Sequence, residues 1–293
     1  MDLNIIIRTQ DSKNDHIKDC LHRAYDFGYE CVAINTVIDS SVLSGKNITI
    51  PEPLTVTFDV ENCRNFQIVN RLTAVIEDGI HAHHLLKSPI PKKYDLLALQ
   101  PGNEKMLQHI CSTLDVDIIS LNLAEDMGYS LKRTYIGQAI EKNMSFEIQY
   151  SPCLRDQTSK RLIISNSQLL VDVSKGKNVI ISSGAIKPLE LRTVEDVINL
   201  GCLFGLKMNQ TNSVVRKNGK VVLSHANTRR KTGCGYVSIS GMCKIPKYQG
   251  WIIKACKVPN ISEATSCIET AKKRTAEDSD DEELKKKAKL LAS

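Results

Sequence analysis

The chain has 293 residues, of which 42% are hydrophobic and 25% are charged, and its formal net charge is +6. This is ordinary globular composition, with enough apolar residues for a full core, and the length suits one large barrel or two smaller domains. The modest positive charge permits an anionic partner without requiring one. No apolar run reaches the ~18 residues that a membrane span needs, so we expect no membrane partner.

The cysteines indicate a reducing compartment. There are ten of them, but no two have the C-x-x-C spacing that is typical of many zinc and redox sites. The first ten residues, MDLNIIIRTQ, lack the long apolar region of a secretory signal. We therefore expect most of the thiols to fill the core as small hydrophobic side chains.

Short apolar runs alternate with helical patterns along residues 1–240. Several runs are continuous, which is typical of strands covered on both faces. The alternation predicts an α/β fold, a TIM-like (β/α) barrel, with a doubly wound open sheet as the alternative. The expected helices include 15–27, 104–114, 132–143 and 159–174. The expected strands are 3–7, 31–38, 67–76, 95–99, 117–123, 146–150 and 178–182.

The clearest strand–loop–helix unit lies between Lys175 and Lys207. Its helix, 193–205, can be capped by Thr193, and Gly205 suits the position after the helix end, where φ is often positive. A helix near 212–217 follows, and the apolar patch after it, 221–223, is the weakest indication of a last strand. Residues buried in the strands are expected to include Ile5, Val32, Ile34, Ile118, Ile180 and Ile181.

The pattern changes after residue 240. We expect a barrel domain over 1–240 and a low-order tail over 241–293, because the charge blocks of the tail cannot bury a core. Ser279 lies in DSDDEE, a context that acid-directed kinases favour, and it is a candidate for phosphorylation; the alternative is an unmodified solvated tail. Two basic clusters are candidates for nuclear import: Lys272, Lys273 and Arg274, then Lys285, Lys286, Lys287 and Lys289.

Histidines form one candidate metal cluster, His81, His83 and His84. Two imidazoles two residues apart on a strand could bind a metal. The neighbouring residues instead indicate a loop or short helix, and no carboxylate or cysteine completes the set, so a solvated segment is favoured. We predict no metal site, no cofactor and no catalytic residue.

Basic residues at strand ends and in the following loops are stronger candidates. Several are expected to share one face of the barrel, where their charge would bind phosphates or a partner. The alternatives are scattered solvated side chains and internal ion pairs, for example Arg192 with Glu190 or Glu195. The candidates are Arg71, Lys132, Arg133, Lys187, Arg192, Arg229 and Arg230.

Several segments resemble one known family in the right order. KNVIISSGAIKPLELRTVEDVINLGCLFGL at 177–206 closely resembles the signature of the thirty-kilodalton protein subunit of ribonuclease P and ribonuclease MRP. GYECVAIN at 28–35, KRTYIGQAIEKNMSFEIQYSP at 132–152 and SHANTRRKTGCG at 224–235 agree with it. The resemblance covers roughly residues 1–240.

This resemblance implies a barrel related to the polymerase-and-histidinol-phosphatase metal hydrolases. Those relatives begin with D-L-H-x-H, whereas this chain has Asn4 and Ile6 where the imidazoles would be. Their second strand typically ends in T-D-H, and the matching stretch here is Asn35-Thr36-Val37. Apolar side chains cannot bind such a cation, so we expect the metal site to be dismantled.

The family implies a non-catalytic subunit of a ribonucleoprotein nuclease in the nucleus and nucleolus. The RNA would supply the chemistry that removes the 5′ leader of precursor tRNA. The protein would brace the ribonuclease P RNA, and the MRP RNA, and would bind other subunits, including a small ribonucleoprotein-fold protein. The alternative is a stand-alone metal-dependent phosphoesterase, which needs three or more His, Asp or Glu ligands at the strand C-terminal ends.

Overall fold

The computed structural model describes residues 1–7, 15–43, 50–54, 56, 66–88 and 90–231. The expected boundary at 240, the import clusters and Ser279 lie outside these residues. Within the described residues, no helix is long and apolar enough to cross a membrane.

The strands of the described chain form one parallel sheet whose spatial order is the chain order. The segment after β7 returns to β1, where Ile6 N donates to Ala185 O at 2.9 Å and Gly184 N donates to Asn4 O at 2.9 Å. These bonds bring the two edges together, so the predicted barrel is confirmed and the open sheet is wrong. The strands are β1 (Asp2–Ile7), β2 (Cys31–Ile38), β3 (Gln67–Ile76), β4 (Leu96–Pro101), β5 (Ile118–Ser120), β6 (Ser145–Gln149) and β7 (Val179–Ser182).

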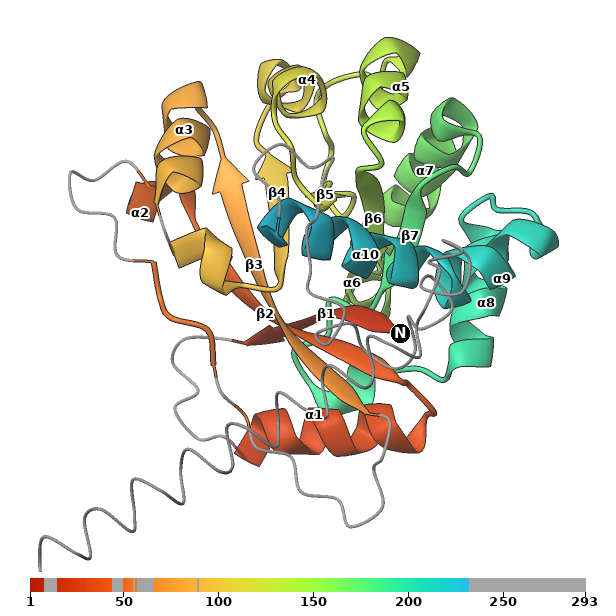
Figure 1. Ribbon diagram of the computed structural model, residues 1–293. Helices are drawn as coiled ribbons and strands as arrows, with labels where there is room; N and C mark the ends of the chain where they lie inside the picture. Colours follow the sequence, from red (N-terminus) through yellow and green to blue (C-terminus); the bar gives the residue numbers. More distant parts are fainter. Residues whose placement is uncertain (8–14, 44–49, 55, 57–65, 89, 232–293) are drawn as a thin grey trace, which may run out of the picture. The chain divides into compact units, whose positions relative to one another are not determined.

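Most helices cover the outside of this barrel, as Figure 1 shows. Outward-facing strand residues such as Ile119 and Ile181 pack beneath them, while Ile34 packs towards α1 with Leu21. The helices are α1 (Asp15–Asp26), α2 (Ser40–Leu43), α3 (Gly79–Lys87), α4 (Glu104–Thr113), α5 (Arg133–Glu141), α6 (Ser151–Arg155), α7 (Gln157–Ser174), α8 (Val194–Leu203), α9 (Met208–Arg216) and α10 (Asn218–Lys231), with 3-10 turns η1 (Ile90–Lys93) and η2 (Pro188–Glu190).

The expected strand core is confirmed. Ile118 and Ile180 point into the barrel, where they belong to the same apolar cluster as Ala33 and Ala98. The predicted residues are each at most 5% exposed: Ile5, Val32, Ile34, Ile118, Ile180 and Ile181.

Helix α10 closes the end of the barrel at which the strands begin. Val222 and Ala226, four residues apart, pack against interior residues such as Leu96. Asn218 Nδ2 donates to Val179 O, the first residue of β7, at 2.6 Å. The patch 221–223 is therefore helical, and the expected last strand is wrong. A run of three apolar residues is compatible with a strand or with a helix. The buried side chains, Val222 and Ala226, are four residues apart, which is the spacing of one face of a helix.

The helix-capping residues predicted for the segment between Lys175 and Lys207 are confirmed. Thr193 accepts a hydrogen bond from Asp196 N at 3.2 Å and caps α8, and Gly205 has φ of 90° just after that helix. Gly201 lets α8 and α9 approach closely, because a Cβ there would lie 2.7 Å from Thr211 Cγ2.

Candidate functional site

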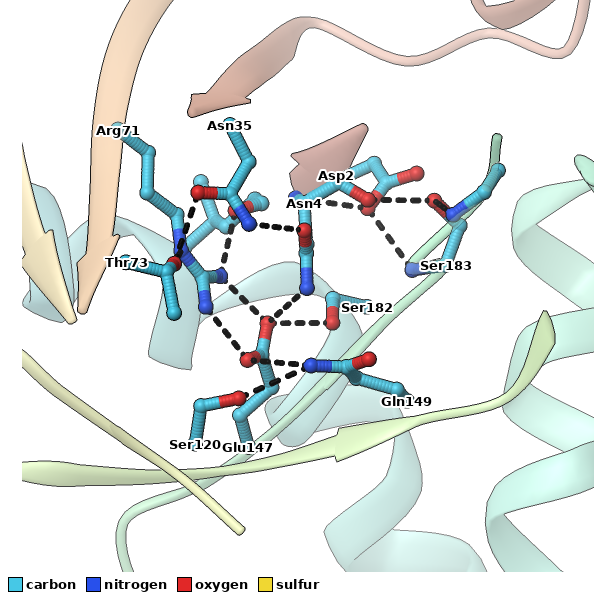
Figure 2. A network of polar contacts seen from close by, with 12 residues as sticks. Asp2, Asn4, Asn35, Arg71, Thr73, Ser120, Glu147, Gln149, Ser182 and Ser183 are labelled. Atoms are coloured by element: carbon cyan, nitrogen blue, oxygen red, sulfur yellow. Dashed lines mark hydrogen bonds and ion pairs between the residues drawn. The ribbon is translucent and has the colours of Figure 1, made fainter. Parts of the chain in front are cut away.

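Polar side chains fill the barrel interior towards the strand C-terminal ends (Figure 2). Side chains two apart on a strand share a face. Four of these polar residues follow an apolar interior residue by two positions: Asn35 after Ala33, Arg71 after Val69, Ser120 after Ile118 and Ser182 after Ile180. We call the whole set the interior polar network: Asp2, Asn4, Asn35, Arg71, Thr73, Ser120, Glu147, Gln149, Ser182 and Ser183.

Arg71 of β3 lies at the centre of this network and has no exposed surface. Its Nη1 and Nη2 donate to the two carboxylate oxygens of Glu147 on β6, at 2.5 and 2.6 Å. Nη1 also donates to Leu3 O at 2.8 Å, and Nε donates to Thr73 Oγ1 at 3.0 Å. A bidentate pair of this kind fixes both side chains in one geometry.

Glu147 receives further hydrogen bonds. Ser182 Oγ donates to its Oε1 at 2.6 Å, and Asn4 Nδ2 donates to the same oxygen at 3.1 Å. Burial acts to raise the pKa of Glu147, but the Arg71 charge and these hydrogen bonds outweigh it, so the pKa is lowered. The buried pair is therefore a guanidinium and an ionised carboxylate.

Neutral groups extend the network to β1 and β2. Asn35 Nδ2 donates to Asn4 Oδ1 at 2.7 Å, and Thr73 Oγ1 donates to Asn35 Oδ1 at 2.7 Å. Asp2 Oδ1 accepts from Ser183 N at 3.0 Å, while its Oδ2 has no hydrogen-bond partner in the described chain. Burial raises the pKa of Asp2, which favours its uncharged form.

These groups do not fit a divalent cation. Both oxygens of Glu147 already bind Arg71, and the side chains at Asn4 and Asn35 are neutral amides committed to each other. Ile6 and Val37 carry no donor atom at all. In the part of the chain that the structure describes, no group of three His, Cys, Asp or Glu residues could hold a metal ion. His81, His83 and His84 lie on the outer helix α3.

Two of the basic candidates have roles other than the surface contact that was expected of them. Arg71, expected on a binding surface, is an internal ion-pair partner without exposed surface, and its assignment is corrected. Arg192 pairs with neither expected glutamate: its Nη1 donates to Leu189 O and Leu191 O at 2.8 and 2.9 Å. Those glutamates are instead paired with Arg155 and Arg216.

Arg229 and Arg230 anchor α10 at the strand N-terminal end. Arg229 Nη2 lies 2.7 Å from Asp117 Oδ2, and Arg230 Nη1 lies 2.5 Å from Asp95 Oδ1. His225 joins this attachment through Nδ1, 2.9 Å from Asp117 Oδ1. These ion pairs attach α10 to the barrel; the side chain of Arg229 is 14% exposed, whereas that of Arg230 is 33% exposed.

The other candidates lie at the opposite end, in or after loops that follow strands. Lys132 pairs with Glu104 at 2.7 Å. Arg133, at the start of α5, and Lys187, between β7 and α8, are exposed. The expectation that several candidates share one face therefore holds only for this smaller group, since Arg229 and Arg230 lie at the other end.

Sequence reasoning missed most of the interior polar network. Its buried acidic residue, Glu147, was not singled out. The sequence did contain a signal for this residue. Glu147 is a charged residue between Phe146 and Ile148 in a segment predicted to be a strand. Such a residue is rarely buried without a partner, and Arg71 within β3 is its counterpart.

Comparisons with known proteins agree with the resemblance. A family model described as RNase P subunit p30 matches residues 1–231. Mouse ribonuclease P protein subunit p30 is 37% identical over 227 residues, which cover 76% of this chain and 84% of the mouse protein. A probable ribonuclease P protein subunit 3 of Schizosaccharomyces pombe is 32% identical over 243 residues, which cover 83% of this chain and 99% of the yeast protein.

A solved structure supports the fold. A chain in the cryo-EM structure of archaeal ribonuclease P with mature tRNA superposes with a TM-score of 0.57 at 12% identity, and the match covers 83% of this chain and 100% of that chain. The matching family model spans the whole described barrel including α10, and the fungal and mammalian relatives align over most of their own length. The chain therefore belongs to the ribonuclease P subunit p30 family.

Proposed function

We propose that this chain is a non-catalytic subunit of the ribonuclease P ribonucleoprotein, and that it also serves in ribonuclease MRP. It braces the catalytic RNA and binds other protein subunits, and the complex removes the 5′ leader of precursor tRNA. The observation that carries the non-catalytic role is the Arg71–Glu147 pair, which fills the barrel interior where a hydrolase would need open metal ligands. A stand-alone phosphoesterase is disfavoured for the same reason.

The direct test is purification of the tagged full-length chain from its own cells, followed by sequencing of the RNA that accompanies it. We expect ribonuclease P RNA, MRP RNA and other protein subunits, among them a small ribonucleoprotein-fold protein. Recovery of MRP RNA would support a role in ribosomal RNA processing. A chain that purifies without RNA and without subunits would contradict the proposal.

Two exposed residues at the strand C-terminal end remain candidates for contact with RNA or a partner. Arg133 and Lys187 form no ion pair within the described chain, in contrast to Lys132. Loss of each phosphate contact should reduce the salt slope of RNA binding by about one. If Arg133→Gln and Lys187→Gln leave both RNA and partner binding unchanged, neither residue belongs to the interface.

We also propose a nuclear and nucleolar location, supported by the family and by the two basic clusters of the tail. A fusion of residues 268–293 to a reporter too large to diffuse through nuclear pores should enter the nucleus. Glutamine at Lys272, Lys273 and Arg274 should weaken entry, because an import carrier binds such clusters by charge. A cytoplasmic reporter would mean that import depends on the assembled complex.

Ser279 is the proposed modification site. Its phosphorylation would add about −1.5 to −2 charges to an acidic block. Mass spectrometry of protein from native cells should find a phosphate on the peptide containing DSDDEE. A peptide that is unmodified under all growth conditions would dismiss this site.

A further inference from the structure

We propose that four exposed lysines at the strand N-terminal end of the barrel form a binding surface for an RNA phosphate backbone. This inference rests on the proposed function as a ribonucleoprotein subunit and adds a site to it. We call the set the lysine cluster: Lys175, Lys177, Lys207 and Lys217. None of them belongs to the basic residues that the sequence pointed to.

Helix α9 connects the segments that carry the four lysines: Lys207 precedes it, Lys217 follows it, and the turn with Lys175 and Lys177 packs against it. At its first turn, Gln210 joins two of them: its Nε2 donates to Lys175 O, and its Oε1 accepts from Lys207 N, both at 3.1 Å. Beyond its last turn, Asn218 Nδ2 donates to Val179 O at 2.6 Å. Both ends of α9 are thus held against the turn between α7 and β7, which carries Lys175 and Lys177.

The charge of the cluster is not compensated. Other cations of the described surface, such as Lys132, Lys220 and Arg216 beside Lys217, lie within 4 Å of a carboxylate, at 2.7, 3.4 and 2.5 Å. Within the described residues, no lysine of the cluster forms an ion pair, and neither does Asp172, one turn before Lys175. Four exposed lysines without an ion-pair partner leave a positive charge on these segments, which attracts a polyanion.

The backbone gives an independent reason to expect a use for Lys175. This residue follows the end of α7 with φ of 57°. Glycine is strongly preferred there, because a Cβ disfavours the left-handed region. The adjacent Gly176 has φ of 69° and Asn178 has φ of 49°. A lysine at a position that favours glycine motivates the hypothesis that its charge is used.

The composition of the surface favours backbone recognition over base recognition. Residues 175–178 and 207–217 contain no aromatic side chain on which a base could stack. Lysine is a flexible point charge rather than a rigid bidentate fork, so it suits phosphates along an irregular path. We therefore infer contact with structured RNA through its phosphates, without sequence preference.

The test compares two variants of the full-length chain that lose the same charge. One has glutamine at all four residues of the lysine cluster. The other has glutamine at four exposed lysines on other elements: Lys18, Lys92, Lys105 and Lys160. Binding of each protein to in vitro transcribed ribonuclease P RNA is measured over a range of salt concentrations, after thermal melting has shown that both fold.

We expect the salt slope of the cluster variant to be flatter than that of wild type by about three, and its affinity at ~0.1 M salt to be at least about tenfold weaker. The control variant should change the slope by less than about one. The tail is identical in both proteins, so it cannot produce a difference between them. Equal effects of the two variants, or no binding by wild type, would overturn the inference.

Purification of the tagged wild-type chain from cells separates this inference from the proposed function. Wild type that recovers neither RNA nor subunits would overturn the proposed function. Wild type that recovers both, together with a cluster variant that binds RNA as wild type does, would overturn the lysine cluster alone.

Discussion

Arg71 and Glu147 form an ion pair with 0% exposed side-chain surface on both partners. Removal of one partner of such a pair leaves an uncompensated buried charge, which typically costs about 3–5 kcal/mol. Because several neutral groups also donate to Glu147, the pair is the centre of the interior polar network and not an isolated contact.

The first prediction is that Arg71→Met lowers the free energy of unfolding by about 3–5 kcal/mol, measured by urea denaturation. Addition of Glu147→Gln should restore much of this loss, because no buried charge is then left unpaired. Lys132→Met is the matched control: it breaks an ion pair in which Lys132 is 54% exposed, and it should leave the denaturation midpoint almost unchanged, because solvent screens an exposed pair. Similar losses in both single variants would contradict a special role for the buried pair.

The pH dependence of this pair has a definite sign. The pKa of Glu147 is lowered by folding, so its contribution to stability is present above the ordinary pKa of glutamate and is lost as pH falls through the lowered value. The double variant should lack this part of acid destabilisation.

The second prediction concerns Lys175, whose φ of 57° favours glycine. Lys175→Gly should raise stability by about 0.5–1 kcal/mol, seen as an increase of roughly 2 °C in Tm. It should also reduce the salt slope of RNA binding by about one. Lys177→Gly is the control, because φ of Lys177 is not positive; it should show no gain in Tm. A fall in Tm for Lys175→Gly would mean that its side chain supports the fold.

At the scale of elements, α10 depends on a few charged contacts for its attachment. His225 Nε2 lies 3.4 Å from Asp115 Oδ1, and its Nδ1 lies 2.9 Å from Asp117 Oδ1. Hydrogen bonds to these two carboxylates outweigh partial burial and raise the pKa of His225 to about 9. Arg229 faces the same Asp117, so a second cation keeps part of the attachment when the imidazole loses its proton.

The third prediction follows from this raised pKa. The contribution of His225 should be complete below its ordinary pKa of about 6.5 and should disappear as pH rises through about 9. Because solvent screens part of the interaction, we expect a loss of about 1–2 kcal/mol over that interval. His225→Gln should remove this pH dependence, and His83→Gln, on the exposed side of α3, should not. Unchanged pH dependence in His225→Gln would contradict a charged imidazole.

The sequence predicted well those elements whose hydrophobic and capping residues follow a regular local spacing. The strand runs and the α8 cap at Thr193 depend on local spacing alone, and the structure confirms them. Helix α10 differs because its polar residues meet Asp95 and Asp117, which are distant in the sequence. The interior polar network was missed for the same reason: partners such as Arg71 and Glu147 are separated by 76 residues.

At the scale of the whole molecule, the described barrel has a filled interior. Apolar residues and α10 fill the end where the strands begin. The Arg71–Glu147 pair occupies the end where related barrels place their chemistry. The lysine cluster proposed above lies on the outer surface of the described barrel.

The fourth prediction is that the purified full-length chain, supplied with Mg²⁺, Mn²⁺ or Zn²⁺, releases no phosphate from p-nitrophenyl phosphate and does not cleave precursor tRNA. The reason is the chemistry of the interior: a catalytic divalent cation is normally held by carboxylates or imidazoles, and the central carboxylate of the network, Glu147, already binds a guanidinium through both oxygens. Trace activity in a preparation can be assigned with the variant that carries both Arg71→Met and Glu147→Gln. A contaminating phosphatase would persist in that preparation at the same level, whereas an intrinsic activity that used the interior would disappear. Turnover that vanishes in the double variant, together with stoichiometric metal in the wild-type protein, would restore the phosphoesterase alternative.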